Sequence, residues 1–253
     1  MARVVSAGSP SIERPDYWWY RARADLLRAA LQQYVGKPAR LLDVGSADGP
    51  SVRWLSERGH RVALDIDPRG LAPGDVCGSA IDLPFVDAAF DVVAAFDVLE
   101  HCEPEARALA EMTRVLVPGG RLLMSVPAYQ WAWSRFDELN HHHRRYTRRS
   151  VVASVEANGL EVLRASYMFA GTFPFFAAER LYAKFRERGA RETVPVPGSV
   201  PRLPQTGPAV ERVLMAATRI DSRLLPRRDL PFGSSVVVAA RKPTDPAWKE
   251  RTP

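Results

Sequence analysis

The sequence predicts an α/β protein with a Rossmann-like, doubly wound sheet of seven strands, mostly parallel with one antiparallel strand. Three observations predict this fold. Apolar runs of strand length alternate with helical patterns over most of the chain. A glycine turn follows the first run, at residues 45–49. A last apolar run, at residues 234–240, follows a long stretch of helical and proline-rich character.

The elements follow in order from these patterns. Residues 1–15 are small and polar and are expected to form a disordered tail. Residues 16–35 repeat apolar side chains at helical spacing until Gly36 and Pro38 end the helix. Strands are expected at residues 40–44, 61–66, 75–78, 90–96, 121–126, 160–167 and 234–240. Helices are expected at residues 50–58, 104–115 and 149–158.

The chain is expected to divide into a core, an insertion, a last core strand and a tail. Residues 16–168 form the predicted core, and residues 169–232 form an insertion that is expected to cover an acceptor. Two helices of the insertion, at 175–187 and 209–225, flank a proline-rich loop. The last core strand lies at 233–241, and 242–253 form a tail.

Composition narrows the classes of function. The formal charge of +6 is explained by an arginine-rich solvated surface, or by an anionic partner such as a phosphate-bearing substrate, RNA or a lipid headgroup. Cys77 and Cys102 have neither disulfide-framework nor zinc-site spacing. The most apolar stretch, 168–178, is shorter than the roughly 20 residues of a membrane span. We therefore expect a cytoplasmic protein, with peripheral contact to a membrane surface still open.

The turn at residues 45–49 is a candidate cofactor site. Gly45 and Gly49 allow a sharp backbone turn at a helix start, where amides can approach a ligand. Asp65 lies about 20 positions further on, at the spacing of an acid that binds ribose hydroxyls. Alone, this pair of features fits nicotinamide enzymes as well as other nucleoside-binding enzymes.

Four further blocks separate these possibilities. They lie in order at residues 78–85, 90–93, 98–101 and 114–121, with sequences GSAIDLPF, FDVV, VLEH and RVLVPGGR. With these blocks the chain resembles the class I S-adenosylmethionine-dependent methyltransferases, in particular the bacterial type 11-like group. The resemblance covers residues 40–127 closely and 140–168 more loosely.

The resemblance implies S-adenosylmethionine as the cofactor and assigns positions to it. The glycine turn is expected under the methionine and ribose, Asp65 on the ribose hydroxyls, and Ile66 on the adenine face. Ser79, Ala80 and Ile81 are expected at the adenine edge, and Phe96 is expected to approach the methionine amino group through its backbone. The complete expected set is Asp43, Gly45, Ser46, Ala47, Gly49, Asp65, Ile66, Ser79, Ala80, Ile81 and Phe96.

Two positions depart from the family pattern. Ala47 stands where the family often has glycine, and a methyl group is tolerated there only at negative φ. Ser79 stands where the family usually has aspartate, so its contact to the adenine amino group lacks a charge. Neither departure favours a nicotinamide cofactor, because the glycines that its pyrophosphate needs are absent as well.

Candidate catalytic residues are His101, His143 and Tyr146. His101 follows the fourth strand and is interpreted as a general base, a metal ligand with Glu100, or part of a strand–helix junction. Residues 143–147 match a string found in the resembling proteins, which favours His143 and Tyr146 for acceptor contact or lid anchoring. Adjacent histidines point in different directions, so the run 141–143 predicts no metal site.

The predicted function is methyl transfer from S-adenosylmethionine to O or N of a small-molecule, sugar or lipid-linked acceptor. An RNA methyltransferase and a non-catalytic Rossmann-like binding module are the alternatives. A nucleic-acid partner is disfavoured, because the chain has neither a recognisable RNA-binding appendage nor an Asn-Pro-Pro-Tyr-like string after the fourth strand.

Overall fold

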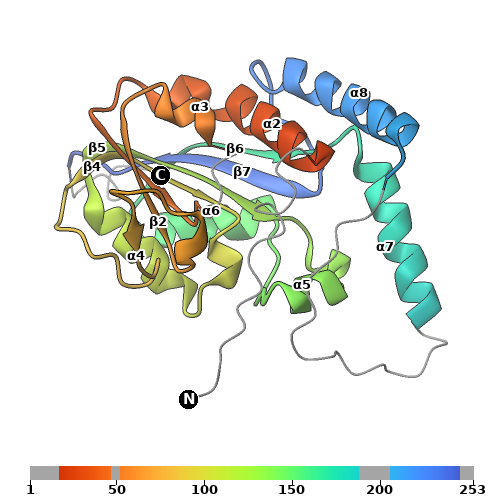
Figure 1. The fold of residues 1–253 in the computed structure, drawn as a ribbon, viewed down its shortest axis with the longest axis horizontal. Helices are drawn as coiled ribbons and strands as arrows, with labels where there is room; N and C mark the ends of the chain where they lie inside the picture. The colour runs from red at the N-terminus through yellow and green to blue at the C-terminus, as the bar shows by residue number, and fades with distance from the viewer. Residues whose placement is uncertain (1–16, 47–51, 188–205, 246–253) are drawn as a thin grey trace.

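The computed structural model describes residues 17–46, 52–187 and 206–245 and has one seven-stranded sheet between two layers of helices (Figure 1). The strand order is β3-β2-β1-β4-β5-β7-β6. The strands are β1 (Arg40–Val44), β2 (His60–Asp65), β3 (Val76–Cys77), β4 (Phe90–Phe96), β5 (Leu116–Pro127), β6 (Glu161–Met168) and β7 (Ser235–Arg241). Strand β7 runs antiparallel to both of its neighbours, and the other pairings are parallel. The predicted fold class is therefore confirmed.

Helices cover both faces of this sheet. Helices α2 (Trp18–Val35), α3 (Arg53–Ser56) and α8 (Pro208–Leu224) lie on one face, and α4 (Glu105–Val115) and α6 (Arg148–Ala157) lie on the other (Figure 1). Because both faces are covered, the central strands carry near-continuous apolar runs, and all of residues 92–96 in β4 are buried. This double cover leaves only the edges of the sheet open to ligands.

Strand β5 begins five residues before its predicted start. Leu116 pairs with Phe90, and the register then shifts before Val92 pairs with Arg121. The Pro-Gly-Gly turn expected at residues 118–120 is thus an irregularity within the strand. Gly120 fits there because a Cβ would lie 2.8 Å from the Val117 carbonyl oxygen.

Two helices of the predicted insertion are present, in different places. Helix α7 (Phe173–Glu187) projects from the end of the sheet where β5 and β6 finish, whereas α8 packs on α2 (Figure 1). The Asp221 carboxylate of α8 accepts a hydrogen bond from the Gly171 amide at 3.1 Å and so ties α8 to the chain before α7. The proline-rich loop and both predicted tails fall largely outside the described residues, and the acceptor-covering role of the insertion stays a prediction.

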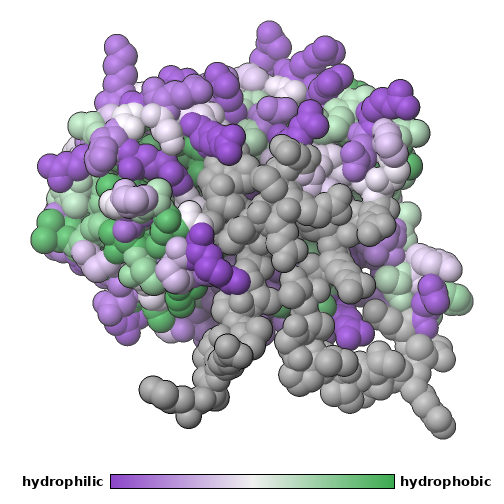
Figure 2. Space-filling model, viewed as in Figure 1, coloured by the Kyte–Doolittle hydropathy of each residue, from purple (hydrophilic) through white to green (hydrophobic). Residues whose placement is uncertain are grey.

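The face of the molecule drawn in Figure 2 has regions of different hydropathy. Hydrophilic side chains dominate the upper edge over α2, α3 and α8, whereas hydrophobic side chains gather over the region of β2 and α4 (Figure 2). Among the described helices, none combines the length and the apolar character that a membrane span requires.

Candidate active site

The glycine turn and Asp65 meet at the carboxyl edge of β1 and β2. The Gly45 amide donates to the Leu64 carbonyl at 2.7 Å, so the turn after β1 is joined to the residue before Asp65. Gly45 has a φ of +73°, and a Cβ there would lie 2.5 Å from Cγ2 of Val98. The Asp65 carboxylate is almost fully buried and accepts from the Asp67 amide at 2.8 Å. The structure therefore brings together the two features that the sequence singled out.

An ion pair supports the turn from the strand side. The buried Asp43 carboxylate accepts from Nε and Nη2 of Arg61, at 2.9 and 2.7 Å. Arg61 also contacts the Ser46 hydroxyl. Burial raises the pKa of Asp43, and the Arg61 guanidinium opposes that rise. Asp43 is thus engaged by the protein itself and holds the turn in position.

An apolar surface and a polar turn lie beside Asp65. Ile66 is 76% exposed, which is unusual for a large aliphatic side chain directly after a core strand. The Gly78 amide donates to the Asp65 carbonyl at 2.9 Å, and this bond sets residues 79–81 next to β2. Within that turn the Ser79 hydroxyl accepts from the Ile81 amide at 3.4 Å. An exposed flat apolar face with polar edges is the kind of site that a purine ring fills.

Strand β4 ends at a charged junction. Phe96 is buried, and the next residue, Asp97, has a φ of +57°. The Asp97 carboxylate accepts from the Ser125 hydroxyl at 2.9 Å and pairs with Arg23 of α2 at 2.8 Å. The sequence reasoning missed Arg23, because nothing local to α2 indicates which strand end it reaches.

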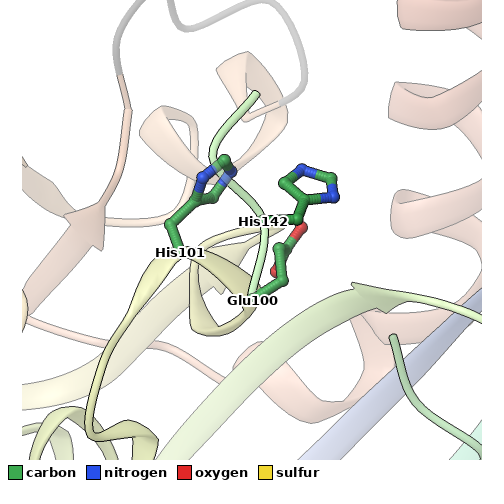
Figure 3. A group of neighbouring side chains, drawn as sticks. All are labelled: Glu100, His101 and His142. Atoms are coloured by element: carbon green, nitrogen blue, oxygen red, sulfur yellow. The ribbon is translucent and has the colours of Figure 1, made fainter. Parts of the chain in front are cut away.

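Three titratable side chains converge beyond this junction. Glu100 and His101 belong to the short turn η2 (Leu99–His101), and His142 comes from the loop after α5 (Arg135–Leu139) (Figure 3). One ligand atom from each of the three side chains lies within 4.8 Å of the other two. We call these residues the Glu–His–His cluster. The rings of His101 and His142 are 4.6 Å apart, edge to face.

Glu100 is the unusual member of the cluster. Its side chain is fully buried, and no donor from another described residue reaches either carboxylate oxygen. Burial and the neighbouring Asp97 carboxylate raise the pKa of Glu100 well above its ordinary value. His101 keeps exposed surface, but desolvation of its ring by the surrounding protein, with the imidazole of His142, lowers the pKa of His101 to about 4.

A buried carboxylate orients His142. Nδ1 of His142 lies 2.9 Å from Oδ1 of Asp137, and Arg145 donates to the same oxygen at 2.7 Å. Burial alone would raise the pKa of Asp137, but the hydrogen bonds from His142 and Arg145 hold that pKa at about 2. The ionised carboxylate therefore accepts a hydrogen bond from the Nδ1–H of His142, and Nε2 of His142 is left for the cluster.

The structure separates the predicted catalytic residues. His101 lies in the cluster, whereas the half-exposed His143 side chain lies 4.0 Å from Glu103. Tyr146 is buried and donates to Glu105 at 2.6 Å, and burial with that carboxylate raises the pKa of Tyr146. His142 was missed because the sequence shows three adjacent histidines without showing which one faces inward.

The string at residues 143–147 fastens the loop to the core. Arg144 donates to Glu105 at 3.0 Å, and Thr147 caps α6. The sequence left two roles open for this string, acceptor contact and lid anchoring. These contacts support anchoring.

Aromatic side chains line the neighbouring end of the sheet. Tyr129 stacks on both Trp131 and Tyr167, and Phe173 of α7 packs against Tyr129 and Phe232. Trp19 instead stacks on the buried Phe169, which is a packing contact. Two expected cofactor positions, Ala47 and Gly49, lie outside the described residues.

Comparisons with known proteins agree with this geometry. Residues 42–124 match the model of the methyltransferase domain family. A biotin biosynthesis bifunctional protein from Cellvibrio japonicus is 33% identical over 49% of this chain and 28% of its own length. A malonyl-[acyl-carrier protein] O-methyltransferase from Methylococcus capsulatus is 30% identical over 54% of this chain and 61% of its own length. The chain thus spans less than two thirds of these relatives.

Solved structures share the fold. The N-methyltransferase NodS from Bradyrhizobium japonicum, in complex with S-adenosylhomocysteine, superposes with a TM-score of 0.54 at 13% identity. That match covers 94% of each chain. Residues 42–124 thus carry a methyltransferase domain, and with its strand order and the turn joined to Asp65 the chain is similar to the class I S-adenosylmethionine-dependent methyltransferases.

Proposed function

We propose that this protein binds S-adenosylmethionine at the carboxyl edge of β1, β2 and β4 and transfers its methyl group to O or N of a small-molecule, sugar or lipid-linked acceptor. The observation that carries the proposal is the 2.7 Å bond from the Gly45 amide to the Leu64 carbonyl. That bond sets a glycine turn with no room for a Cβ directly beside the buried Asp65. The cofactor supplies an activated methyl group on a sulfonium, which is an excellent leaving group.

The residues of this chain then bind, orient and exclude water. Asp65 accepts hydrogen bonds from the ribose hydroxyls, and Ile66 packs on the adenine face. Ser79, Ala80 and Ile81 border the adenine edge, and the backbone after Phe96 reaches the methionine amino group. Gly45 and Ser46 begin the turn under the ribose and methionine, and Asp43 positions that turn through Arg61. Ala47 and Gly49 lie outside the described residues and stay predicted members of the cofactor site.

The Glu–His–His cluster lies on the acceptor side in this proposal. Imidazole nitrogens of His101 and His142 are able to hydrogen-bond to the acceptor atom and to receive its proton. His143 and Tyr146 anchor the loop that carries His142 and are not assigned a contact with the acceptor.

A group of aromatic side chains at the same edge of the sheet supports an acceptor with an apolar part. Tyr129, Trp131 and Phe173 form an aromatic cluster, and Trp131 remains 39% exposed. Helix α7 adds exposed apolar side chains, with Phe175 at 62% and Phe185 at 75%. Aromatic and apolar surface with a few polar groups is typical of small-molecule sites.

Calorimetric titration with S-adenosylmethionine tests the cofactor site. Asp65→Asn removes the charge that binds the ribose, so we expect affinity to fall about 10- to 100-fold, the range for a lost hydrogen bond to a charged group. Asp67→Asn is the matched control, because its carboxylate pairs with Arg69 in the next turn and its amide still supports Asp65. Absence of binding to the wild-type protein at millimolar ligand would overturn the proposal.

Product formation with a panel of acceptors tests the second part of the proposal, which is methyl transfer to an acceptor. S-adenosylhomocysteine release with hydroxyl- or amine-bearing small molecules, sugars or lipid-linked acceptors supports the assignment. Salt-sensitive binding of RNA would favour the RNA methyltransferase alternative instead. Cofactor binding with no turnover on any acceptor would favour a non-catalytic binding module.

The compartment is part of the proposal as well. Both cysteines are free thiols, Cys77 exposed and Cys102 buried. Free thiols support a reducing compartment such as the cytoplasm. Reversible oxidation of the exposed Cys77 in purified protein, followed by mass spectrometry, would measure how strongly the protein depends on that environment.

A further inference from the structure

The Glu100 carboxylate lacks a compensating cation. It is fully buried, and no donor from another described residue reaches its oxygens. The two guanidinium groups near it already pair with other carboxylates, Arg23 with Asp97 at 2.8 Å and Arg145 with Asp137 at 2.7 Å. A buried carboxylate without a partner costs several kcal/mol, so such a group either holds a proton or binds a cation.

Two imidazole nitrogens, one from His101 and one from His142, face the same space. Nδ1 of His142 is held by Asp137, which leaves Nε2 for the cluster. The His101 ring is held in turn by a hydrogen bond to the backbone of Asn140. Carboxylate or carbonyl partners on the second ring nitrogen are the usual arrangement behind metal-bound histidines, because they fix the tautomer and the ring orientation.

We propose that Glu100, His101 and His142 bind a divalent transition-metal ion of the zinc, cobalt or manganese class. Two imidazole nitrogens and one carboxylate oxygen form a ligand set that suits these ions and leaves positions open for water or an acceptor atom. The ligand atoms lie within 4.8 Å of one another. Figure 3 shows the three side chains gathered at one place. Metal–nitrogen bonds of about 2.0–2.1 Å require these atoms to approach further when the ion binds.

The ligand types decide between ions. Magnesium and calcium prefer all-oxygen sites, and only one of the three side chains offers oxygen. Neutral imidazoles and a carboxylate favour zinc and its neighbours in the first transition row.

The cation gives the acceptor side a chemical preference, and this consequence rests on the proposed function. A hydroxyl bound at an open position loses its proton to solvent more readily, because the ion lowers the pKa of bound oxygen. The oxygen then forms a bond to the methyl carbon while the carbon–sulfur bond breaks and its electron pair stays on sulfur. An oxygen acceptor is therefore favoured over nitrogen.

Cobalt titration tests the site without any need for activity. Untagged full-length protein is stripped with a chelator and titrated with Co²⁺, whose visible absorption reports imidazole coordination. We expect one equivalent to bind and one equivalent of Zn²⁺ to displace it. His142→Ala and Glu100→Gln are each expected to weaken binding at least about 100-fold, since loss of an outer partner alone costs 10- to 100-fold.

His143→Ala is the matched control. It removes the adjacent, half-exposed histidine, and we expect cobalt affinity to stay within about twofold of the wild type. Circular dichroism and S-adenosylmethionine binding by the same variants separate loss of the site from loss of the fold. Equal weakening in His143→Ala, or no cobalt absorption in the wild type, would overturn the proposal and favour a proton shared between Glu100 and the imidazoles. Cobalt binding without cofactor binding would instead keep the metal site and overturn the proposed function.

Discussion

The two halves of the candidate active site are built in different ways. The cofactor half lies at the ends of β1 and β2, and its central contact joins the turn at Gly45 to the strand residue Leu64. The acceptor half is the loop at residues 134–146, in which Asp137 is held by both His142 and Arg145, and this loop joins η2 through the His143 amide, which donates to the Glu100 carbonyl at 2.8 Å. One half is a backbone turn between two strands, and the other is a network of buried charged side chains within one loop that packs on η2. We therefore expect substitutions in the cofactor half to reduce ligand affinity, and substitutions in the acceptor half to reduce stability first.

The largest expected effect is at Asp137. Asp137→Asn leaves the Arg145 guanidinium, whose side chain is 5% exposed, without its carboxylate partner. Breaking a buried pair in this way costs about 3–5 kcal/mol in the free energy of unfolding, measured by denaturant titration. Asp87→Asn is the control, because the exposed Asp87–Arg114 pair contributes about 0–1 kcal/mol. Similar losses of unfolding free energy in both variants would contradict the view that the acceptor half depends on buried charge pairs.

The Asp137 network also predicts a dependence on pH. The pKa of Asp137 is about 2 in the folded protein, below its ordinary value of 3.8. A depressed pKa stabilises the fold above pH 3.8, and that stability is lost as the pH falls toward 2. It corresponds to about 2 kcal/mol at neutral pH. The difference in unfolding free energy between wild type and Asp137→Asn should accordingly shrink between pH 5 and pH 2; a constant difference would contradict this account.

Gly45→Ala tests whether the turn in the cofactor half holds the ligand. An alanine there has an unfavourable positive φ, which costs about 1–2 kcal/mol, and its Cβ meets Cγ2 of Val98 at 2.5 Å. We expect the turn to shift and S-adenosylmethionine affinity to fall by at least about 10-fold in calorimetry. Gly159→Ala has a similar positive φ with open space around it, so it should lose stability only. Equal cofactor affinity in the two variants would show that the turn does not hold the ligand.

A smaller effect is expected at Tyr146. Tyr146→Phe removes the hydrogen bond to Glu105, which still accepts from Arg144 and from Ser154. Loss of a bond to a charged group costs about 1.5 kcal/mol, visible as a lower melting temperature. Cofactor affinity should not change. A large loss of affinity with an unchanged melting temperature would assign Tyr146 to ligand contact instead of anchoring.

The smallest effect is expected for Ile66→Ala, which should change cofactor affinity without changing stability. Ile66→Ala truncates a side chain that is 76% exposed, so the free energy of unfolding should barely change. If Ile66 packs on adenine, its loss weakens S-adenosylmethionine binding by about 1 kcal/mol, or roughly fivefold. Val86→Ala, at a residue that is 77% exposed and is not among the expected cofactor residues, should change neither quantity. Unchanged affinity in Ile66→Ala would remove that residue from the site.

The sequence by itself determined the α/β class, the parallel strands and the position of the glycine turn before Asp65. These features depend on residues that are close along the chain or on strand ends that must share one edge of a parallel sheet. Strand β4 has the predicted bounds, 90–96, because a fully buried strand between turn signals has an unambiguous pattern.

Only the tertiary structure decided which histidine faces the site. His141, His142 and His143 are equivalent as a pattern, and the choice depends on the Asp137 carboxylate, which fixes one ring of the three. Likewise, the burial of Glu100 and the pairing of Arg23 with Asp97 depend on how α2, η2 and the loop pack together. Long-range burial and charge pairing leave no period or spacing in the sequence, so their partners become known only when the chain is folded.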